Sequence, residues 1–254
     1  MFPIKRILTS GRDEFLDEFS LAFDGSNDYI DCQTNFESNL FNSAFSIALW
    51  LKVVDGTPSA IEYIFGTKSG EDNIWARVET DGDIQFYYKE GSTEANVTAS
   101  TYFSSAPANS YDWVHFVFTL SDSAQTIYAN GVEIASGTTS LDTSGFAQDT
   151  NRNLFIGARN NAGSADGNME GKISDFAIYD IALTEGQVKT IYNKRQPYNH
   201  RRSILDNNLL AWYRMGDGIE NGVQISKVYD MSSNNNVAAP QNMAANDYEN
   251  PGVR

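Results

Sequence analysis

Alternation of apolar and polar residues with a period of two is the feature that most constrains how this chain can fold. In residues 45–53 the apolar side chains fall on one face of an extended segment: Phe45, Ile47, Leu49, Leu51 and Val53. The same pattern returns in residues 114–120 and dominates the chain from residue 20 to about residue 182. Because this period is typical of half-buried β-strands, we predict an all-β fold of two antiparallel sheets packed face to face.

Size, charge and cysteine content restrict the classes of protein to which the chain can belong. Its 254 residues, 41% of them hydrophobic, suffice for one main domain with a sizeable core. The formal net charge of −15 repels nucleic acid and anionic membranes on average, so neither is an expected partner.

A single cysteine, Cys32, excludes an intramolecular disulfide framework, and two histidines, His115 and His200, disfavour a histidine-rich metal site. No stretch has the apolar length of a membrane span and the first residues lack a signal-peptide core, so we expect synthesis in the cytoplasm.

Turn residues indicate two hairpins. The dipeptide Asn130-Gly131 is typical of a two-residue type I′ turn, which would place Ile127 opposite Ile134. Around residues 81–83 we predict a three-residue loop that opposes Val78 with Phe86, because a slip of one residue would mix core and solvent side chains. The outer face of that hairpin then carries an exposed set of side chains: Trp75, Arg77, Gln85 and Tyr87.

The C-terminal part of the pattern changes in character. Strands are expected at residues 154–159 and 172–179, followed by a short helix that begins with a capping box at Thr184 and Gln187. We divide the chain into an N-terminal arm (1–19), a main domain (20–196) and a C-terminal extension (197–254) with an added strand near 209–215 and an extended tail. In that extension His200-Arg201-Arg202 either binds acidic groups or solvates a linker, and in the main domain His115 is expected at the surface.

Several segments, in order, resemble one known superfamily. They are Leu21-Ala-Phe-Asp-Gly-Ser-Asn-Asp-Tyr-Ile30, residues 45–52, residues 113–135, Leu154-Phe-Ile-Gly157 and residues 171–192. Together they look like the laminin-G-like, concanavalin A-like lectin/glucanase domain, in particular its bacterial and phage branch, over roughly residues 20–195. The resemblance implies a jelly-roll sandwich with one short helix after the closing strand, here with extended terminal arms. Residues 212–218 followed by residues 228–236 resemble a segment that commonly precedes such a domain, so they form either a permuted strand of the same sandwich or a strand donated to a neighbouring subunit.

The resemblance also directs the search for chemistry. Glucanases of this superfamily use a trio of carboxylates on one strand. The nearest approach here is Glu79, Asp81 and Asp83, but Asp81 and Asp83 fall in the predicted turn and no closing Glu follows, so no catalytic residues are assigned and the chain is expected not to be an enzyme. Relatives often hold a structural calcium ion, for which Asp24 and Asp175 are the matching positions, with Asn27 or Asp28 as a third ligand. The alternative is that Asp24 caps the turn at Gly25 and that Asp175 bonds backbone.

Two functions remain open from the sequence. The first is a virion structural protein, a decoration, cement or fibre-associated protein of a bacteriophage, whose terminal arms contact other virion proteins or copies of itself. The second is a carbohydrate-binding adhesion module of the extracellular surface that recognises host glycans. Trp75, Arg77, Gln85 and Tyr87 suit either, since aromatic rings beside polar donors stack on sugars and also favour protein interfaces.

Overall fold

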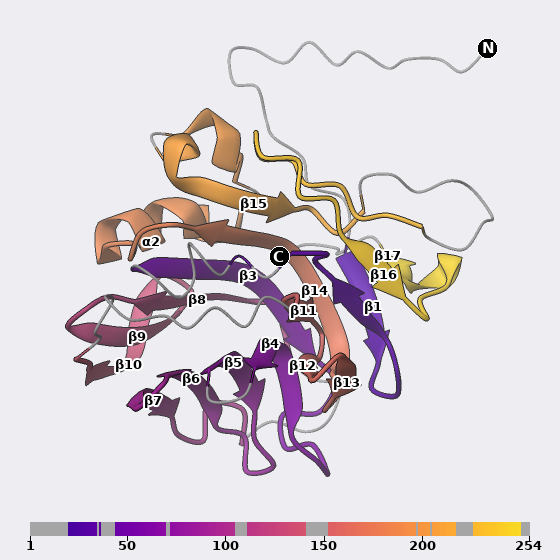
Figure 1. Ribbon diagram of the computed structural model, residues 1–254, viewed down its shortest axis with the longest axis horizontal. Helices are drawn as coiled ribbons and strands as arrows, with labels where there is room; N and C mark the ends of the chain where they lie inside the picture. The colour runs from indigo at the N-terminus through magenta and orange to yellow at the C-terminus, as the bar shows by residue number, and fades with distance from the viewer. Residues whose placement is uncertain are drawn as a thin grey trace.

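The computed structural model shows two antiparallel sheets packed face to face, which confirms the predicted all-β sandwich (Figure 1). The structure describes residues 20–34, 36, 44–69, 72–104, 111–140, 152–196, 198–203, 205–216 and 226–249. The predicted N-terminal arm, residues 1–19, lies outside the described residues. Within the described part of the chain, no helix has the length and apolar character needed to span a membrane.

The first sheet, which we call sheet A, has the strand order β10-β9-β8-β3-β14-β1-β17, with β15 paired to β14. Its strands are β1 (Ser20–Asp24), β3 (Phe45–Val53), β8 (Val114–Leu120), β9 (Ala124–Ala129), β10 (Val132–Thr138), β14 (Glu170–Tyr179), β15 (Leu209–Tyr213) and β17 (Tyr248–Glu249). The expected strands at 45–53, 114–120, 172–179 and 209–215 are therefore present in one sheet.

The second sheet, sheet B, has the order β16-β2-β11-β4-β5-β6-β7. Its strands are β2 (Tyr29–Asp31), β4 (Glu62–Ser69), β5 (Asp72–Val78), β6 (Ile84–Glu90), β7 (Thr93–Ala99), β11 (Phe155–Ile156), β12 (Arg159–Asn161), β13 (Ser164–Asp166) and β16 (Ala239–Gln241). The hairpin of β12 and β13 joins this sheet through a parallel pairing of β12 with β4. The expected strand at 154–159 is thus divided between β11 and β12.

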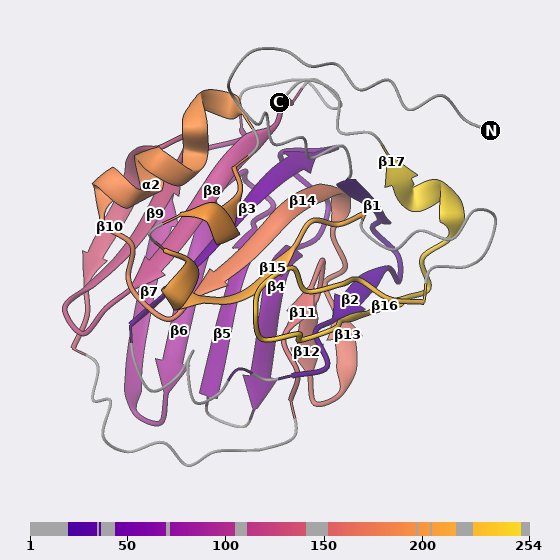
Figure 2. The same ribbon diagram turned by 90° about the horizontal axis from the view of Figure 1, so that it is seen from above.

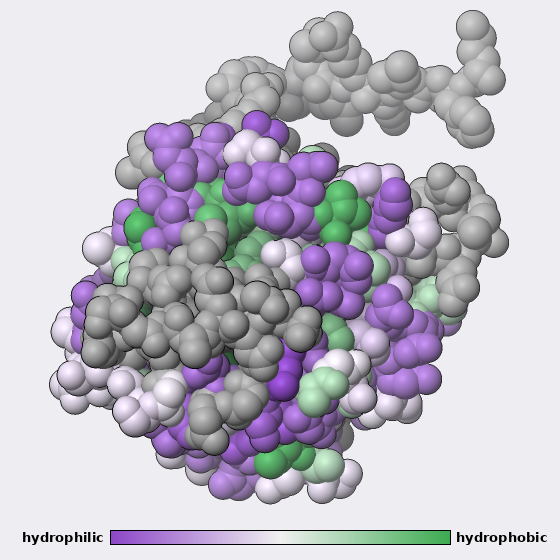
Figure 3. Space-filling model, viewed as in Figure 1, coloured by the Kyte–Doolittle hydropathy of each residue, from purple (hydrophilic) through white to green (hydrophobic). Residues whose placement is uncertain are grey.

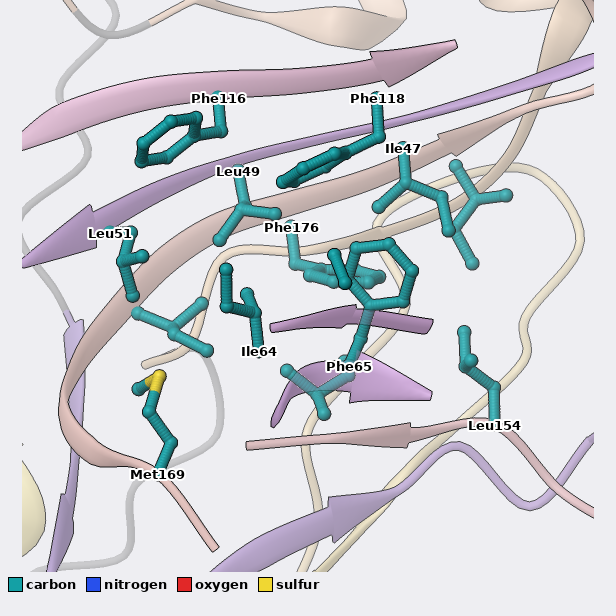
Figure 4. Packing of buried hydrophobic residues seen from close by; sticks show 14 of the residues in the cluster. Ile47, Leu49, Leu51, Ile64, Phe65, Phe116, Phe118, Leu154, Met169 and Phe176 are labelled. Atoms are coloured by element: carbon teal, nitrogen blue, oxygen red, sulfur yellow. The ribbon is translucent and has the colours of Figure 1, made fainter. Parts of the chain in front are cut away.

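Aromatic and aliphatic side chains from both sheets fill the space between them (Figure 4). Phe65 of sheet B meets Phe118 and Phe176 of sheet A edge to face, with ring centroids 5.5 and 5.9 Å apart. The side chains predicted to share the inner face of β3, from Phe45 to Val53, are all buried. By contrast, the surface in Figure 3 is mainly hydrophilic where residues are described, and the large apolar side chains exposed there and elsewhere in the described part are Val132 and Tyr229.

The two-residue turn at Asn130 and Gly131 pairs Ala129 with Val132 as expected. Farther along that hairpin, and throughout the hairpin of β5 and β6, the registers differ from the predicted ones. Asn130 and Gly131 have the positive φ angles of a type I′ turn, +50° and +80°, but a bulge after Glu133 places Ala135, not Ile134, opposite Ile127. In the other hairpin Val78 pairs with Ile84, not with Phe86. The loop there is longer than predicted because it runs from Glu79 to Asp83 and is closed by hydrogen bonds from Glu79 N to Asp83 O (2.9 Å) and from Gly82 N to Glu79 O (3.0 Å). The error is two residues, so every side chain keeps its predicted face.

A short helix, α2 (Glu185–Tyr192), covers the outer face of sheet A (Figure 2). The predicted capping box between Thr184 and Gln187 is present. Residues of the helix lie over Trp50 and His115: the Tyr192 ring centroid is 6.0 Å from that of Trp50 and 5.9 Å from that of His115. His115 is consequently 2% exposed, and its predicted place at the surface is wrong because the helix packs over its strand.

The C-terminal segment packs on its own chain. Strand β15 pairs with β14, β16 with β2 and β17 with β1, with short 3-10 turns at His200–Arg202, Asp206–Asn208 and Ala245–Asp247. The permuted-strand alternative therefore describes β15, and β16 and β17, which lie in the predicted extended tail, also pair with strands of the same chain. Buried apolar side chains hold the segment in place: Leu205, Leu209, Trp212, Met215, Val228 and Met243.

Candidate functional site

The outer face of β4–β7, on the side of the sandwich away from α2 (Figures 1 and 2), carries two cross-strand rows of side chains. The polar row consists of Tyr63, Arg77, Gln85 and Thr98, which are partners in register on four neighbouring strands. The aromatic row runs beside it and consists of Arg159, Gly66, Trp75, Tyr87 and Asn96. Both rows face outward because the alternate residues of the same strands fill the core. The four predicted candidates, Trp75, Arg77, Gln85 and Tyr87, thus share this one face.

Hydrogen bonds fix the polar row in one arrangement. Arg77 is the central donor: its Nε donates to Gln85 Oε1 (3.0 Å) and its Nη1 to Tyr63 OH (3.2 Å). Gln85 in turn donates from Nε2 to Thr98 Oγ1 (3.2 Å). A third side of the guanidinium forms an ion pair with Glu79. The planar fork of arginine suits this use because it presents several donors in fixed directions.

The aromatic row is built on a nearly parallel stack. The rings of Trp75 and Tyr87 lie 4.6 Å apart with an angle of 7° between their planes. The guanidinium carbon of Arg77 lies 4.1 Å from the Trp75 ring centroid, and Tyr63 meets Trp75 edge to face at 5.8 Å. These neighbours leave Trp75 only 6% exposed, which corrects its predicted place in an exposed set. Tyr87 is half-buried, as are Arg77 and Gln85.

Arg159 extends the aromatic row onto β12. Its guanidinium lies 4.4 Å from the Tyr63 ring centroid and is ion-paired with Asp166 of β13. Gly66 permits this packing, since a Cβ there would lie 2.8 Å from Trp75 Cβ and 3.2 Å from Arg159 Cγ. Sequence reasoning missed Tyr63 because a bulge between Tyr63 and Phe65 interrupts the alternation of β4. It missed Arg159 because no local pattern indicates that β12 pairs in parallel with β4.

The two predicted calcium ligands are far apart. Asp24 is the register partner of Glu170, five positions before Asp175 on β14, so about 16 Å of strand separates them. Calcium ligands lie about 2.3–2.6 Å from the ion, and the two carboxylates therefore cannot share one. Within the described residues, no group of three or more His, Cys, Asp or Glu side chains is placed to hold a metal ion.

Each of these carboxylates has a structural contact instead. Asp24 Oδ1 accepts hydrogen bonds from the backbone N–H groups of Ser26 (2.8 Å) and Asn27 (3.2 Å), so it caps the turn at Gly25 as the alternative held. Asp28 accepts from Asp24 N (3.0 Å), and burial together with the nearby Asp24 charge raises the pKa of Asp28 to about 6. Calcium binding near Asp24, Asn27 and Asp28 stays a prediction.

Asp175 belongs to a buried polar cluster beneath the C-terminal segment. Its Oδ1 accepts from Trp212 Nε1 (2.5 Å), and its Oδ2 lies 3.6 Å from His200 Nε2. His200 Nδ1 contacts the Tyr179 hydroxyl, and burial raises the pKa of Tyr179 well above its usual range. The predicted surface role of His200 is wrong, because the imidazole is 1% exposed and joins the extension to sheet A.

The carboxylates at residues 79–83 have the turn role that the sequence predicts. Glu79 is ion-paired with Arg77. Asp81 Oδ1 accepts from Asp83 N (3.3 Å), and Asp83 Oδ1 accepts from Thr101 N (2.5 Å). Two of the three carboxylates therefore fix loop backbone.

Comparison with solved structures identifies proteins of the same fold. The chain is similar to a Bacteroides ovatus protein described as a "putative carbohydrate binding protein", with a TM-score of 0.63 and 18% identity over 92% of this chain and 60% of that one. It is also similar to the binding domain of botulinum neurotoxin serotype C1 (TM-score 0.53, 17% identity, 73% of this chain and 45% of that one). A third similar structure is the binding domain of botulinum neurotoxin DC in complex with SialylT (TM-score 0.52, 17% identity, 72% and 43%). The chain therefore spans less than two thirds of the length of each of these structures.

A comparison with curated protein sequences finds no match. A protein-family model does match, over residues 24–189, and its description is "Concanavalin A-like lectin/glucanases superfamily". The matched residues extend from the end of β1 into α2 and include most strands of both sheets. On this match, together with the sandwich that the residues form, the chain belongs to the concanavalin A-like lectin/glucanases superfamily.

Proposed function

We propose that the chain is a non-catalytic carbohydrate-binding module and that its sugar-binding surface is formed by the polar and aromatic rows of β4–β7. The observation that carries this proposal is the near-parallel stack of Trp75 and Tyr87 beside the hydrogen-bonded polar row. Such a surface suits a pyranose, which has an apolar C–H face and a rim of hydroxyl groups.

Each row has its own part in binding. Tyr87, the half-buried aromatic ring of the stack, offers the apolar contact. The polar groups nearest to it are Asn96, which is exposed, and Gln85 and Thr98, which are half-buried. Because Trp75 and Arg77 are held by several neighbours, the surface is ordered before a ligand arrives, which reduces the entropic cost of binding.

A hydrolytic role is less well supported by the same face. Glycoside hydrolysis needs two carboxyl groups placed on either side of the scissile bond. The carboxylates that border the rows, Glu79 and Asp166, are each ion-paired with an arginine of the face. Such pairing suits fixed positioning of the arginines rather than proton transfer.

The similar structures support a binding function, as one is described as a carbohydrate binding protein and others are toxin binding domains. Their identity to this chain is below 20%, so the ligand must be argued from the residues of this chain. The virion hypothesis rested on the absence of a signal-peptide core, on the unpaired cysteine and on long terminal arms expected to lie on other chains. Residues 235–249 pack on the sandwich itself, and we do not propose a virion role.

The experiment that tests this proposal is a glycan array followed by titration calorimetry of the ligands found. We expect Tyr87→Ala to lower the affinity at least tenfold and Tyr87→Phe to keep most of it, because the ring and not the hydroxyl makes the contact. Tyr229→Ala is the matched control, since Tyr229 is a tyrosine more exposed than Tyr87, at 42%, and lies in the C-terminal segment. Binding of no glycan, or equal loss of affinity in both alanine variants, would refute the proposed surface.

A further inference from the structure

The charges that border the two rows nearly cancel. Four cations lie on the outer face of the strands, Arg77, Arg159, Lys68 and Lys89, and three carboxylates lie with them, Glu79, Asp166 and Glu94. Their formal sum is 4 − 3 = +1. The whole chain carries −15, so this face is far from the strong positive field that would attract an acidic ligand.

Both arginines are also ion-paired with a carboxylate of the face, although Arg159 Nε has no hydrogen-bond partner among the described residues. Each of the three guanidinium nitrogens of Arg77 has a partner: two donate hydrogen bonds to Gln85 and Tyr63, and the third is ion-paired with Glu79. Arg159 stacks on Tyr63 and pairs with Asp166. In addition, Lys89 lies directly opposite Glu94 on the neighbouring strand. Recognition of a sugar carboxylate or sulfate by arginine works through a charge-assisted, bidentate contact, and here a protein carboxylate already takes that place.

On the side of Tyr87 that faces β7, in contrast, the members of the two rows are uncharged. Asn96 is its register partner on β7, and Gln85 and Thr98 are the neighbouring members of the polar row. Amide and hydroxyl groups both donate and accept hydrogen bonds, as sugar hydroxyl groups do. Resting on the proposed function, we infer that this surface selects neutral glycans and discriminates against sialylated, uronic-acid and sulfated ones.

The test compares neutral and acidic probes on the full chain. The probes are neutral glucose, mannose, galactose and xylose hexasaccharides, against sialyllactose and a galacturonic-acid hexasaccharide, titrated at 50 and 500 mM NaCl. We expect binding of at least one neutral probe, with an affinity that changes less than twofold with salt, and no detectable binding of the acidic probes. A charged contact would instead weaken steeply, because 500 mM salt shortens the screening length to a few ångströms.

A gain-of-function variant tests the cause of the selectivity. Glu79→Gln and Asp166→Asn together release Arg77 and Arg159 from their carboxylates while keeping side-chain volume. This double variant should bind sialyllactose detectably under conditions in which the original chain does not. The matched control is Glu185→Gln, which releases Lys189 on α2, and it should not bind sialyllactose.

The outcomes separate the inference from the function on which it rests. Salt-sensitive binding of acidic probes by the original chain, lost in Tyr87→Ala, would overturn the neutral selectivity and leave a glycan-binding surface in place. Absence of binding to every probe, and of array hits, would overturn both. Binding of neutral probes without any gain in the double variant would show that carboxylate pairing is not the cause of the selectivity.

Discussion

Ser20 and Glu249 are register partners on neighbouring strands, β1 and β17, so the first and last described residues of the chain lie side by side. Proteins tolerate circular permutation best where segments near the two ends of the chain lie close together, as β1 and β17 do. The resemblance of residues 212–218 and 228–236 to a segment that precedes such domains fits the same geometry, because β15 and β16 lie within the sandwich of their own chain.

The first prediction concerns this permuted order. Joining Arg254 to Met1 and opening the chain between Gln196 and Pro197 places the C-terminal segment first while keeping every residue. We expect a β-rich circular dichroism spectrum and one cooperative thermal transition within about 10 °C of the original chain, since all strand pairings remain available. A permutant opened inside β3, between Leu49 and Trp50, is the control that should fail to fold. Aggregation of both variants would contradict the prediction.

The buried cluster around Asp175 gives a second prediction. Trp212→Phe removes the Nε1 donor that lies 2.5 Å from Asp175 but keeps most of the ring. We expect the free energy of unfolding to fall by about 2–3 kcal/mol, because a buried carboxylate loses a hydrogen-bond donor. The measurement is urea unfolding followed by circular dichroism.

A double-mutant cycle provides the control for that cluster. In an Asp175→Asn background, Trp212→Phe should lower the free energy of unfolding by at least about 1 kcal/mol less than it does in the original chain. The reason is that the side chain at position 175 then carries no buried charge that needs the Trp212 donor. Additive costs in the two backgrounds would show that the loss comes from ring packing and not from the hydrogen bond.

The raised pKa of one carboxyl group, that of Glu62, predicts that the folded state becomes less stable as the pH rises. Burial raises the pKa of Glu62 from its ordinary 4.5 to about 7, so the folded state binds the proton more tightly than the unfolded state does. Stability is then highest below pH 4.5 with respect to this group and falls as the pH rises from 4.5 to 7. One pKa unit corresponds to about 1.4 kcal/mol, and with solvent screening we expect Glu62→Gln to stabilise the fold by about 2 kcal/mol at pH 8. Melting curves at pH 4.5 and pH 8 check this, and an equal effect at both pH values would contradict it.

The sequence predicts the faces of strands better than their partners. The alternation around residues 74–89 places Trp75 and Tyr87 on one face correctly, because side-chain direction is a local property with a period of two. The register is wrong by two residues because it depends on the loop from Glu79 to Asp83, where backbone hydrogen bonds lengthen the turn. The sequence does not predict Arg159 as part of the site. Arg159 contacts Tyr63 only because β12 pairs with β4, which precedes it by about ninety residues.

Burial of the two histidines shows the same limit. The sequence predicts both histidines at the surface, because His115 falls on the face opposite Val114, Phe116 and Phe118 and because His200 precedes Arg201 and Arg202. In the fold α2 covers one, and the C-terminal segment encloses the other between Tyr198 and Trp212. Both histidines are buried by elements that pack on the outer face of sheet A. The alternation of residues within a strand does not predict which elements cover that face.

The last prediction tests whether the polar row holds the aromatic row in place. Arg77→Lys keeps the charge, but an ammonium group cannot donate to Gln85 and Tyr63 while it pairs with Glu79 and covers Trp75. We expect glycan affinity to fall about fivefold to tenfold, or about 1–1.4 kcal/mol, because Trp75 and Gln85 lose their fixed arrangement. The melting temperature should fall by only about 2–4 °C. Arg195→Lys is the matched control, as Arg195 forms an exposed ion pair with Asp112 away from these strands, and it should change neither quantity. Unchanged glycan affinity in Arg77→Lys would show that the order of the surface does not depend on this arginine.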